Sequence, residues 1–144
     1  MARGRTWKLL LVEDDTDSAE ALMSLFELHD IETLWSVDGR AALQALDSIE
    51  RLGDRAPDFA LLDLNLPNTD TVRLGRDLIA HSIGCPVVLV SASSSQLLEK
   101  AAGEIGAVGT LRKPFSMDGL VETLRQHAHS AEERELSRQS AAPR

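Results

Sequence analysis

Apolar and polar positions follow two different periods along this chain. Five short segments rich in consecutive apolar residues are typical of buried strands, and they lie at 8–12, 31–35, 59–62, 86–90 and 107–111. Each is followed by a segment with apolar positions at helical spacing, and these lie at 17–29, 38–49, 71–81, 96–105 and 115 to about 128. Strands that alternate with helices predict an α/β fold, in which right-handed crossovers build a doubly wound five-stranded parallel sheet with helices on both faces.

Capping residues support the first two helices. Thr16 is the expected N-cap of the first and Asp38 of the second, because side-chain oxygens of these residue types accept hydrogen bonds from the free N–H groups of a first turn. We expect an N-terminal extension over residues 1–7, a single domain over 8–130, and a polar tail or linker over 131–144. A chain of 144 residues suits one domain with a substantial core.

Composition restricts the classes of function. A formal net charge of -8 disfavours direct binding to nucleic acid or to anionic membranes. No apolar run approaches the roughly 20 residues of a membrane helix, and the basic segment 1–8 lacks the apolar stretch of a signal peptide. We therefore expect a cytoplasmic protein that binds neither membrane nor nucleic acid. The single cysteine, Cys85, lies beside an apolar run, which favours a buried structural thiol over a reactive one.

Polar side chains collect where the predicted strands end. Glu13 and Asp14 follow the first strand, and Asp63 follows the third. Ser91 and Lys113 follow the fourth and fifth strands. Because ligands of open parallel sheets bind at the carboxyl ends of the strands, these side chains are expected to form one site.

The charges of that site favour a metal ion and a phosphoryl group. Two carboxylates about 4 Å apart repel by roughly 4 kcal/mol at an effective dielectric constant of 20. Glu13, Asp14 and Asp63 therefore need a cation, and their oxygen ligands favour Mg²⁺. An Asp carboxylate can act as a nucleophile toward phosphorus, and positioning and charge neutralisation supply most of the catalysis of phosphoryl transfer.

Four ordered motifs resemble the response-regulator receiver domains of two-component signalling. They are Leu11-Val12-Glu13-Asp14-Asp15, Leu62-Asp63-Leu64-Asn65-Leu66-Pro67, Val90-Ser91-Ala92 and Leu111-Arg112-Lys113-Pro114-Phe115. The resemblance covers residues 8 to 130 and implies the flavodoxin-like strand order 2-1-3-4-5. It also implies a phosphorelay in which a sensor histidine kinase or a histidine phosphotransfer protein donates the phosphoryl group, so that the chain is a phosphoprotein whose only catalysis is its own phosphorylation and dephosphorylation.

The same resemblance assigns roles to individual residues. Asp63 would be the phosphoacceptor, and Asp14 and Asp63 would bind Mg²⁺ directly. The backbone carbonyl of Asn65 would add a metal ligand, and Glu13 would act through water. Ser91 would bond a phosphoryl oxygen, and Lys113 would pair first with Asp63 and then with the phosphate. The Lys113–Pro114 peptide bond would be cis.

Two residues depart from the family pattern. Thr110 stands where the family usually has an aromatic switch residue, which places the coupled movement of Ser91 in question. Thr71 stands where a glycine is common, and it would be strained if its backbone required positive φ.

Other functions compete with this one. A haloacid-dehalogenase-like phosphatase would need a second Asp where Asn65 stands, and a flavodoxin-like FMN carrier would need a hydroxyl- or amide-rich loop where Glu13 and Asp14 stand. A receiver-like module that binds partners without phosphorylation is the main alternative. We expect the partner surface, and a possible homodimer contact, on the face of the fourth helix, fifth strand and fifth helix, including Leu97 and Leu98.

Overall fold

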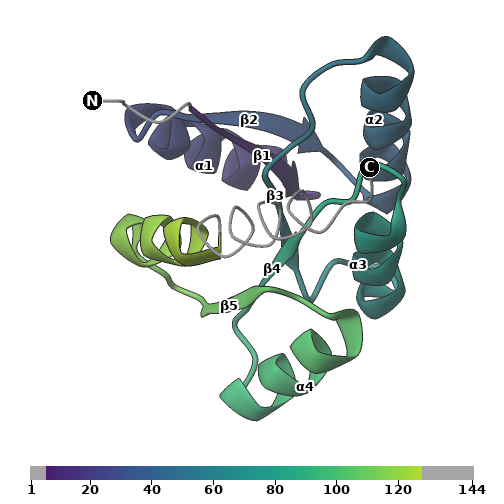
Figure 1. Cartoon of the computed structure of the whole chain (residues 1–144). Helices are drawn as coiled ribbons and strands as arrows, with labels where there is room; N and C mark the ends of the chain where they lie inside the picture. The colour runs from purple at the N-terminus through teal and green to yellow at the C-terminus, as the bar shows by residue number, and fades with distance from the viewer. Residues whose placement is uncertain (1–5, 128–144) are drawn as a thin grey trace, which may run out of the picture.

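The computed structural model describes residues 6–127 as a five-stranded parallel sheet flanked by helices (Figure 1). The strands are β1 (Trp7–Val12), β2 (Ile31–Ser36), β3 (Phe59–Asp63), β4 (Val87–Ser91) and β5 (Gly109–Arg112). The helices are α1 (Thr16–Leu28), α2 (Gly39–Leu52), α3 (Thr71–Ala80), α4 (Ser95–Ile105) and a C-terminal helix that covers residues 117–127 of the described range. The strand order β2-β1-β3-β4-β5 confirms the predicted α/β class and topology.

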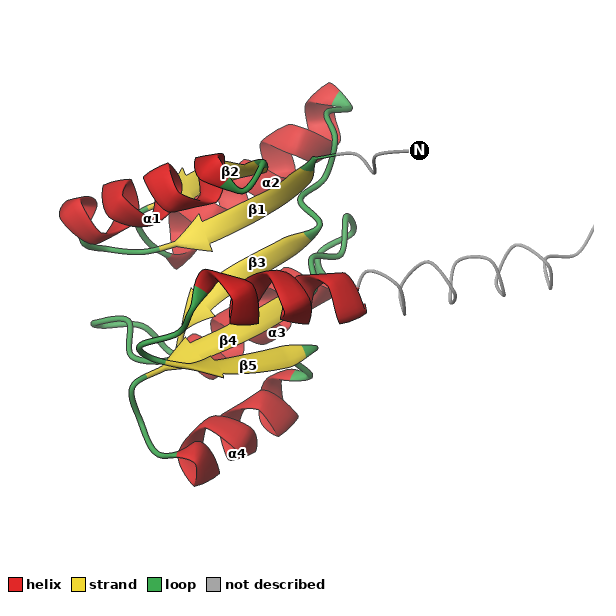
Figure 2. Cartoon of the chain, turned by 90° about the vertical axis from the view of Figure 1, so that its left-hand side faces the viewer, coloured by secondary structure: helices red, strands yellow, loops and turns green. Residues whose placement is uncertain are grey.

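The strands alternate between two apolar cores because successive side chains point to opposite faces of the sheet. Leu9 and Leu11 of β1 face α1 and the C-terminal helix, whereas Leu10 and Val12 face α2, α3 and α4. Figure 2 shows the same layers, with α1 and the C-terminal helix on one side of the strands and α2 and α3 on the other. Both faces are covered, which explains the near-continuous apolar runs of β3 and β4.

The helix ends correct one prediction and bear out another. Asp15, not Thr16, is the N-cap of α1, because its Oδ2 accepts a hydrogen bond from Ser18 N at 2.8 Å and Thr16 is already helical. Asp38 caps α2 as predicted, with its Oδ1 accepting from Ala41 N at 2.8 Å. The N-cap is therefore one position earlier than predicted, because the Asp15 carboxylate reaches the free N–H of Ser18, three residues further along the chain.

The loop before α3 removes the concern over Thr71. Within residues 6–127, the non-glycine residues with positive φ are Asp30 and Asn68. Asn68, with φ of 53°, takes the left-handed position, which Asn tolerates better than most residues. Thr71 is the first residue of α3, follows the N-cap Asp70, and is buried.

One residue of the predicted partner surface lies in the core instead. Leu97 of α4 is 58% exposed, but the next residue, Leu98, is 2% exposed and packs against the sheet. The prediction that Leu98 belongs to the surface is therefore wrong, because successive residues of a helix point about 100° apart. Leu97 remains available on that face.

The amino ends of the strands are held by a cluster that we call the amino-edge clasp, formed by Lys8, Arg55 and Asp58. Asp58 Oδ2 accepts from Lys8 N at 2.8 Å and from Arg55 Nη2 at 2.6 Å. Arg55 Nη2 also donates to the carbonyl of Thr6, and Lys8 Nζ donates to the carbonyl of Arg55, both at 2.6 Å. The clasp joins the start of β1 to the loop that enters β3.

The described part of the chain has no helix that is both long and apolar enough to span a membrane. The predicted tail over 131–144 lies outside the described residues. Cys85 is buried two residues before β4, as expected from its apolar neighbours.

Candidate functional site

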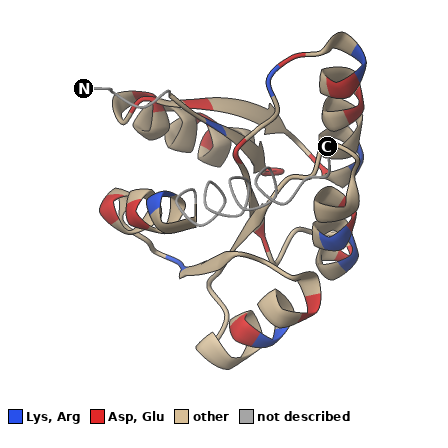
Figure 3. Ribbon diagram, viewed as in Figure 1, with Lys and Arg blue, Asp and Glu red and all other residues tan. Residues whose placement is uncertain are grey.

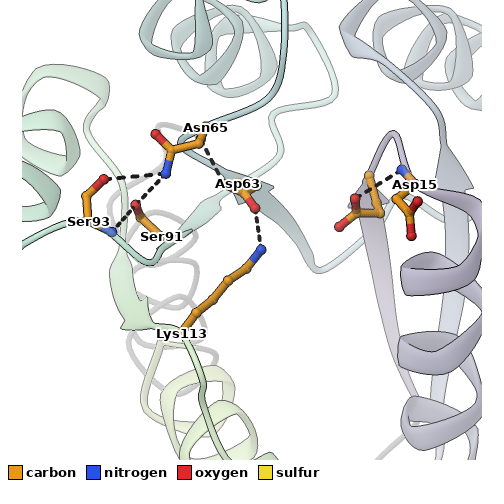
Figure 4. Close-up of polar contacts among 7 residues, drawn as sticks. Asp15, Asp63, Asn65, Ser91, Ser93 and Lys113 are labelled. Atoms are coloured by element: carbon orange, nitrogen blue, oxygen red, sulfur yellow. Dashed lines mark hydrogen bonds and ion pairs between the residues drawn. The ribbon is translucent and has the colours of Figure 1, made fainter.

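The carboxyl ends of four neighbouring strands bring the predicted residues to one edge of the sheet. Asp63 ends β3 and Ser91 ends β4, while Glu13 directly follows β1 and Lys113 directly follows β5. These strands are adjacent and parallel, so their ends meet at one edge. Figure 4 shows Asp63, Asn65, Ser91 and Lys113 gathered there, with Asp15 across from them on the α1 side.

Asp63 has both carboxylate oxygens engaged. Its Oδ2 accepts from Lys113 Nζ at 2.5 Å, and its Oδ1 accepts from the backbone N of Asn65 at 2.8 Å. The Lys113 side chain is 42% exposed and that of Asp63 is 19% exposed. Solvent therefore screens the ion pair, and we expect it to orient the two groups more than it stabilises the fold.

Glu13 is held by its backbone as well as by its side chain. Its N–H donates to the carbonyl of Ser36 at 3.1 Å, and its carbonyl accepts from Trp35 Nε1 at 2.8 Å. Burial raises the pKa of the Glu13 carboxyl above its ordinary value, and nearby Asp14 raises it further. The N–H of Asp15, which donates to Glu13 Oε2 at 3.1 Å, and the charge of Lys113 act in the opposite direction.

The other two acids of the β1–α1 loop differ in role. Asp15 is occupied as the N-cap of α1, and the Ser18 N–H that it accepts lowers the pKa of its carboxyl. Asp14 is exposed to solvent beside the site. Asp15 therefore has a structural task, whereas Asp14 is exposed and acts on the carboxyl of Glu13.

A pocket adjoins this group of charges. Its lining combines Glu13, Asp63 and Lys113 with apolar side chains from β1, α1, β3, β4 and the segment after β5, namely Leu11, Val12, Leu22, Leu61, Val90 and Phe115. The pocket therefore places the three charged groups beside an apolar wall.

Ser91 stands at the centre of a hydrogen-bond network. The residue is fully buried, and its Oγ accepts from Asn65 Nδ2 at 3.0 Å and from Ser93 N at 2.9 Å. Asn65 Nδ2 also donates to Ser93 Oγ at 3.4 Å, and the Ser91 carbonyl accepts from Lys113 N at 2.9 Å. The network links the β3–α3 loop, the β4–α4 loop and the end of β5.

The donor set suits a water-rich magnesium site. Within residues 6–127, no three His, Cys, Asp or Glu side chains are grouped closely enough to hold a metal ion by themselves. Mg²⁺ does not require such a cage, because it keeps several waters and uses one or two carboxylates together with phosphate oxygens. Glu13 and Asp63 line one pocket, so the oxygen ligands fit the ion in that form.

Sequence patterns missed part of this arrangement. The side chain of Asn65 and the residue Ser93 were not expected to contact Ser91, and Trp35 was not expected to hold Glu13. Ser93 lies two residues after Ser91 in a serine-rich turn, which was the available signal. The Lys113–Pro114 peptide bond is cis, as the resemblance implied. Thr110 donates to Glu99 of α4 at 3.3 Å.

Comparison with known proteins gives one consistent family. The model of the response regulator receiver domain matches residues 9–125. The transcriptional regulatory protein YxdJ of Bacillus subtilis is 30% identical over 124 residues, which are 86% of this chain and 51% of the relative. The transcriptional regulatory protein PrrA of Mycobacterium tuberculosis is 34% identical over 114 residues, 79% of this chain and 46% of the relative. The chain thus spans about half the length of these relatives.

Solved structures agree. The receiver domain of the Francisella response regulator 1452 has a TM-score of 0.69 and 27% identity, covering 83% of this chain and 94% of that one. The BeF3-activated N-terminal receiver domain of RstA from Klebsiella pneumoniae has a TM-score of 0.66 and 30% identity, covering 83% of this chain and 97% of that one.

Proposed function

Because this chain belongs to the response-regulator receiver family, whose model covers residues 9–125, we propose that it is a phosphorylation switch with Asp63 as the phosphoacceptor. The observation that carries the proposal is the arrangement at the sheet edge. The Asp63 carboxylate contacts the Lys113 ammonium, with Ser91 on the next strand and Glu13 in the same pocket. A nucleophile, a fixed positive charge, a hydroxyl and a second carboxylate are the groups that aspartyl phosphorylation requires.

The proposed reaction is a single displacement at phosphorus. An oxygen of the Asp63 carboxylate attacks the phosphorus of a phosphohistidine, and the bond between phosphorus and the imidazole nitrogen breaks with its electron pair going to that nitrogen. Lys113, already bound to Asp63 Oδ2, follows the negative charge as it spreads over the phosphoryl oxygens. The product is an acyl phosphate on Asp63 and a neutral histidine on the donor, because the phosphohistidine that reacts carries a proton on its other ring nitrogen.

A bound Mg²⁺ would neutralise the carboxylates and the transferred phosphoryl oxygens. Asp14 and Asp63 are the proposed direct ligands, the Asn65 carbonyl is a third, and Glu13 acts through water. The exposed position of Asp14 and the shared pocket of Glu13 and Asp63 support this assignment.

The proposed donor is a sensor histidine kinase or a histidine phosphotransfer protein in the cytoplasm, and the chain catalyses no reaction other than its own phosphorylation and dephosphorylation. The proposed output surface consists of α4, β5 and the C-terminal helix, either for a partner or for a second copy. Leu97, exposed by 58%, is the apolar residue that this face offers from α4.

The test uses acetyl phosphate, Mg²⁺ and intact-mass measurement. We expect the wild-type chain to gain one phosphoryl group, and Asp63→Asn to gain none. Asp54→Asn is the matched control because Asp54 is an exposed carboxylate away from the site, and it should be phosphorylated like the wild type. No gain by the wild-type chain at saturating donor would overturn the proposal.

That negative result would favour the alternative, a receiver-like module that binds partners without phosphorylation. The observation in favour of this alternative is Thr110, which stands at the position of the family's aromatic switch residue and bonds to Glu99 instead. Binding of a partner to Asp63→Asn with unchanged affinity would support it further.

A further inference from the structure

The Ser91 hydroxyl accepts hydrogen bonds in this structure but is not seen to donate one within residues 6–127. A hydroxyl can accept two hydrogen bonds and donate one. Ser91 Oγ accepts from Asn65 Nδ2 at 3.0 Å and from Ser93 N at 2.9 Å, so both lone pairs are engaged. Throughout residues 6–127, no hydrogen bond donated by this hydroxyl is found, so its proton remains to be placed.

Burial makes this imbalance significant. Ser91 has 0% of its surface exposed, so the O–H cannot rely on bulk water, and an unsatisfied buried donor is costly. Asn65 by contrast is exposed and lies two residues after Asp63, to which its own backbone N–H donates at 2.8 Å. The Asn65 amide group therefore connects the proposed phosphoacceptor loop to the buried hydroxyl of Ser91.

We propose that Asn65 is a positioning residue that fixes the Ser91 hydroxyl as a hydrogen-bond donor toward the phosphoryl group. The Asn65 amide N–H and the Ser93 N–H occupy both lone pairs of Ser91 Oγ, so this hydroxyl can interact with an incoming phosphoryl oxygen only by donating its proton. This inference rests on the proposed function, because it requires a phosphoryl group at Asp63. It assigns a role to the side chain of Asn65, separate from that of its backbone carbonyl.

The alternative role for Asn65, holding Ser91 away from the phosphoryl group, predicts the opposite effect on the rate of phosphorylation. If the Asn65 amide instead held Ser91 away from the phosphoryl group, its removal would free the hydroxyl and accelerate phosphorylation. Under our proposal, the removal of the amide lets the hydroxyl rotate among several orientations, and phosphorylation slows.

A double-mutant cycle tests the proposal, because it isolates an effect that passes from one residue through another. The rate constant of phosphorylation by acetyl phosphate with Mg²⁺ is measured by intact mass for the wild type, Asn65→Leu, Ser91→Ala and the double variant. Leu has nearly the shape of Asn without its donor. The loss of one hydrogen bond predicts a rate about fivefold lower for Asn65→Leu. In the Ser91→Ala background, the same change should alter the rate by less than about twofold.

Ser93→Ala is the matched control. It removes a hydroxyl that accepts from Asn65 at 3.4 Å but keeps the backbone N–H that donates to Ser91, so its rate should stay within about twofold of wild type. Thermal melts of all variants show whether each is folded at the assay temperature.

The outcomes separate the two proposals. A faster Asn65→Leu variant, an unchanged rate, or an equal loss in both Ser91 backgrounds would overturn the role of Asn65 while leaving Asp63 phosphorylation intact. A wild-type chain that gains no phosphoryl group would overturn the proposed function itself.

Discussion

The two edges of the sheet both carry charged residues, but they differ in how far these residues are paired by hydrogen bonds and opposite charges within the chain. At the amino edge, the Asp58 carboxylate of the clasp accepts from the Arg55 guanidinium and from the backbone N–H of Lys8. Backbone carbonyls accept further hydrogen bonds from the Arg55 guanidinium and the Lys8 ammonium. At the carboxyl edge, the carboxylates of Glu13 and Asp63 line one pocket with a single lysine, Lys113. Figure 3 shows that charged residues lie mainly on helices and at strand ends, so the two edges are where charges meet the sheet.

The difference teaches how to distinguish a structural cluster from a functional one. The amino edge is complete in itself in the sense that each of its charged groups has a hydrogen-bond partner within the chain. The carboxyl edge has an excess of negative charge and a buried hydroxyl whose proton has no acceptor among the described residues. A complete cluster stabilises the fold, whereas an incomplete one is available to a cation and an anionic ligand.

The largest expected effect is the loss of phosphorylation when Asp63 of the carboxyl edge is replaced. Asp63→Asn should abolish the gain of a phosphoryl group, but it should change the free energy of unfolding by less than about 1 kcal/mol because the pair with Lys113 is solvent-screened. Intact mass and urea unfolding measure the two quantities on one sample. A loss of several kcal/mol would mean that the carboxyl edge is a structural cluster after all.

The second prediction concerns Cys85, which is near the amino edge. Burial, with a smaller contribution from the charge of Asp58, raises the pKa of its thiol to about 12. At pH 8 the folded chain should hold about a thousandfold less thiolate than an ordinary cysteine, and should react correspondingly slowly with a thiol reagent. The chain unfolded in urea is the control, and it should react at the ordinary rate.

The same shift sets the direction of a pH dependence. The unfolded thiol loses its proton near pH 9.0 and the folded one near 12, so the unfolded state binds fewer protons between these values. The contribution of Cys85 to stability is therefore complete below pH 9 and is lost as the pH rises toward 12. The difference in unfolding free energy between wild type and Cys85→Ala should shrink over that range, and a growing difference would contradict the assignment.

Third in size is the effect of opening the clasp. Asp58→Ala leaves the Arg55 guanidinium and the Lys8 N–H without this acceptor, so we expect a loss of about 2 to 3 kcal/mol in the free energy of unfolding. Phosphorylation of the folded fraction should be unchanged because the clasp lies at the opposite edge. A large fall in the phosphorylation rate of folded Asp58→Ala would show that the two edges are coupled.

The smallest expected effect concerns an acid near the carboxyl edge whose carboxylate is already occupied by a hydrogen bond within the chain. It tests whether an acid contributes to the site because of its place in the sheet or because its carboxylate is unoccupied. Asp38 follows β2 toward the carboxyl edge, but its Oδ1 is occupied by the N–H of Ala41 as the cap of α2. Asp38→Ala should cost about 1 kcal/mol of stability and leave the rate of phosphorylation unaltered. Asp38→Ser, which can still cap the helix, should recover most of the stability.

The sequence alone was sufficient for the alternation of elements and for most of the candidate site. In parallel βα units every strand ends at the same edge, so acids placed after strands predict a shared site without knowledge of packing. Glu13, Asp63, Ser91 and Lys113 reach that edge for this reason. Local rules also predicted the cap at Asp38, since a cap depends on residues three positions apart.

Tertiary structure decided what depends on neighbours distant in the chain. The Asn65 amide meets Ser91 across 26 residues, and the clasp joins Arg55 to Thr6 across 49, distances over which no periodicity operates. The burial of Leu98 beside exposed Leu97 depends on how α4 rotates against the sheet, which hydrophobicity cannot distinguish for two adjacent leucines. Composition and period determine which elements form, because they act locally, whereas the final pairing of polar groups is fixed only when the packed layers bring them within hydrogen-bond distance.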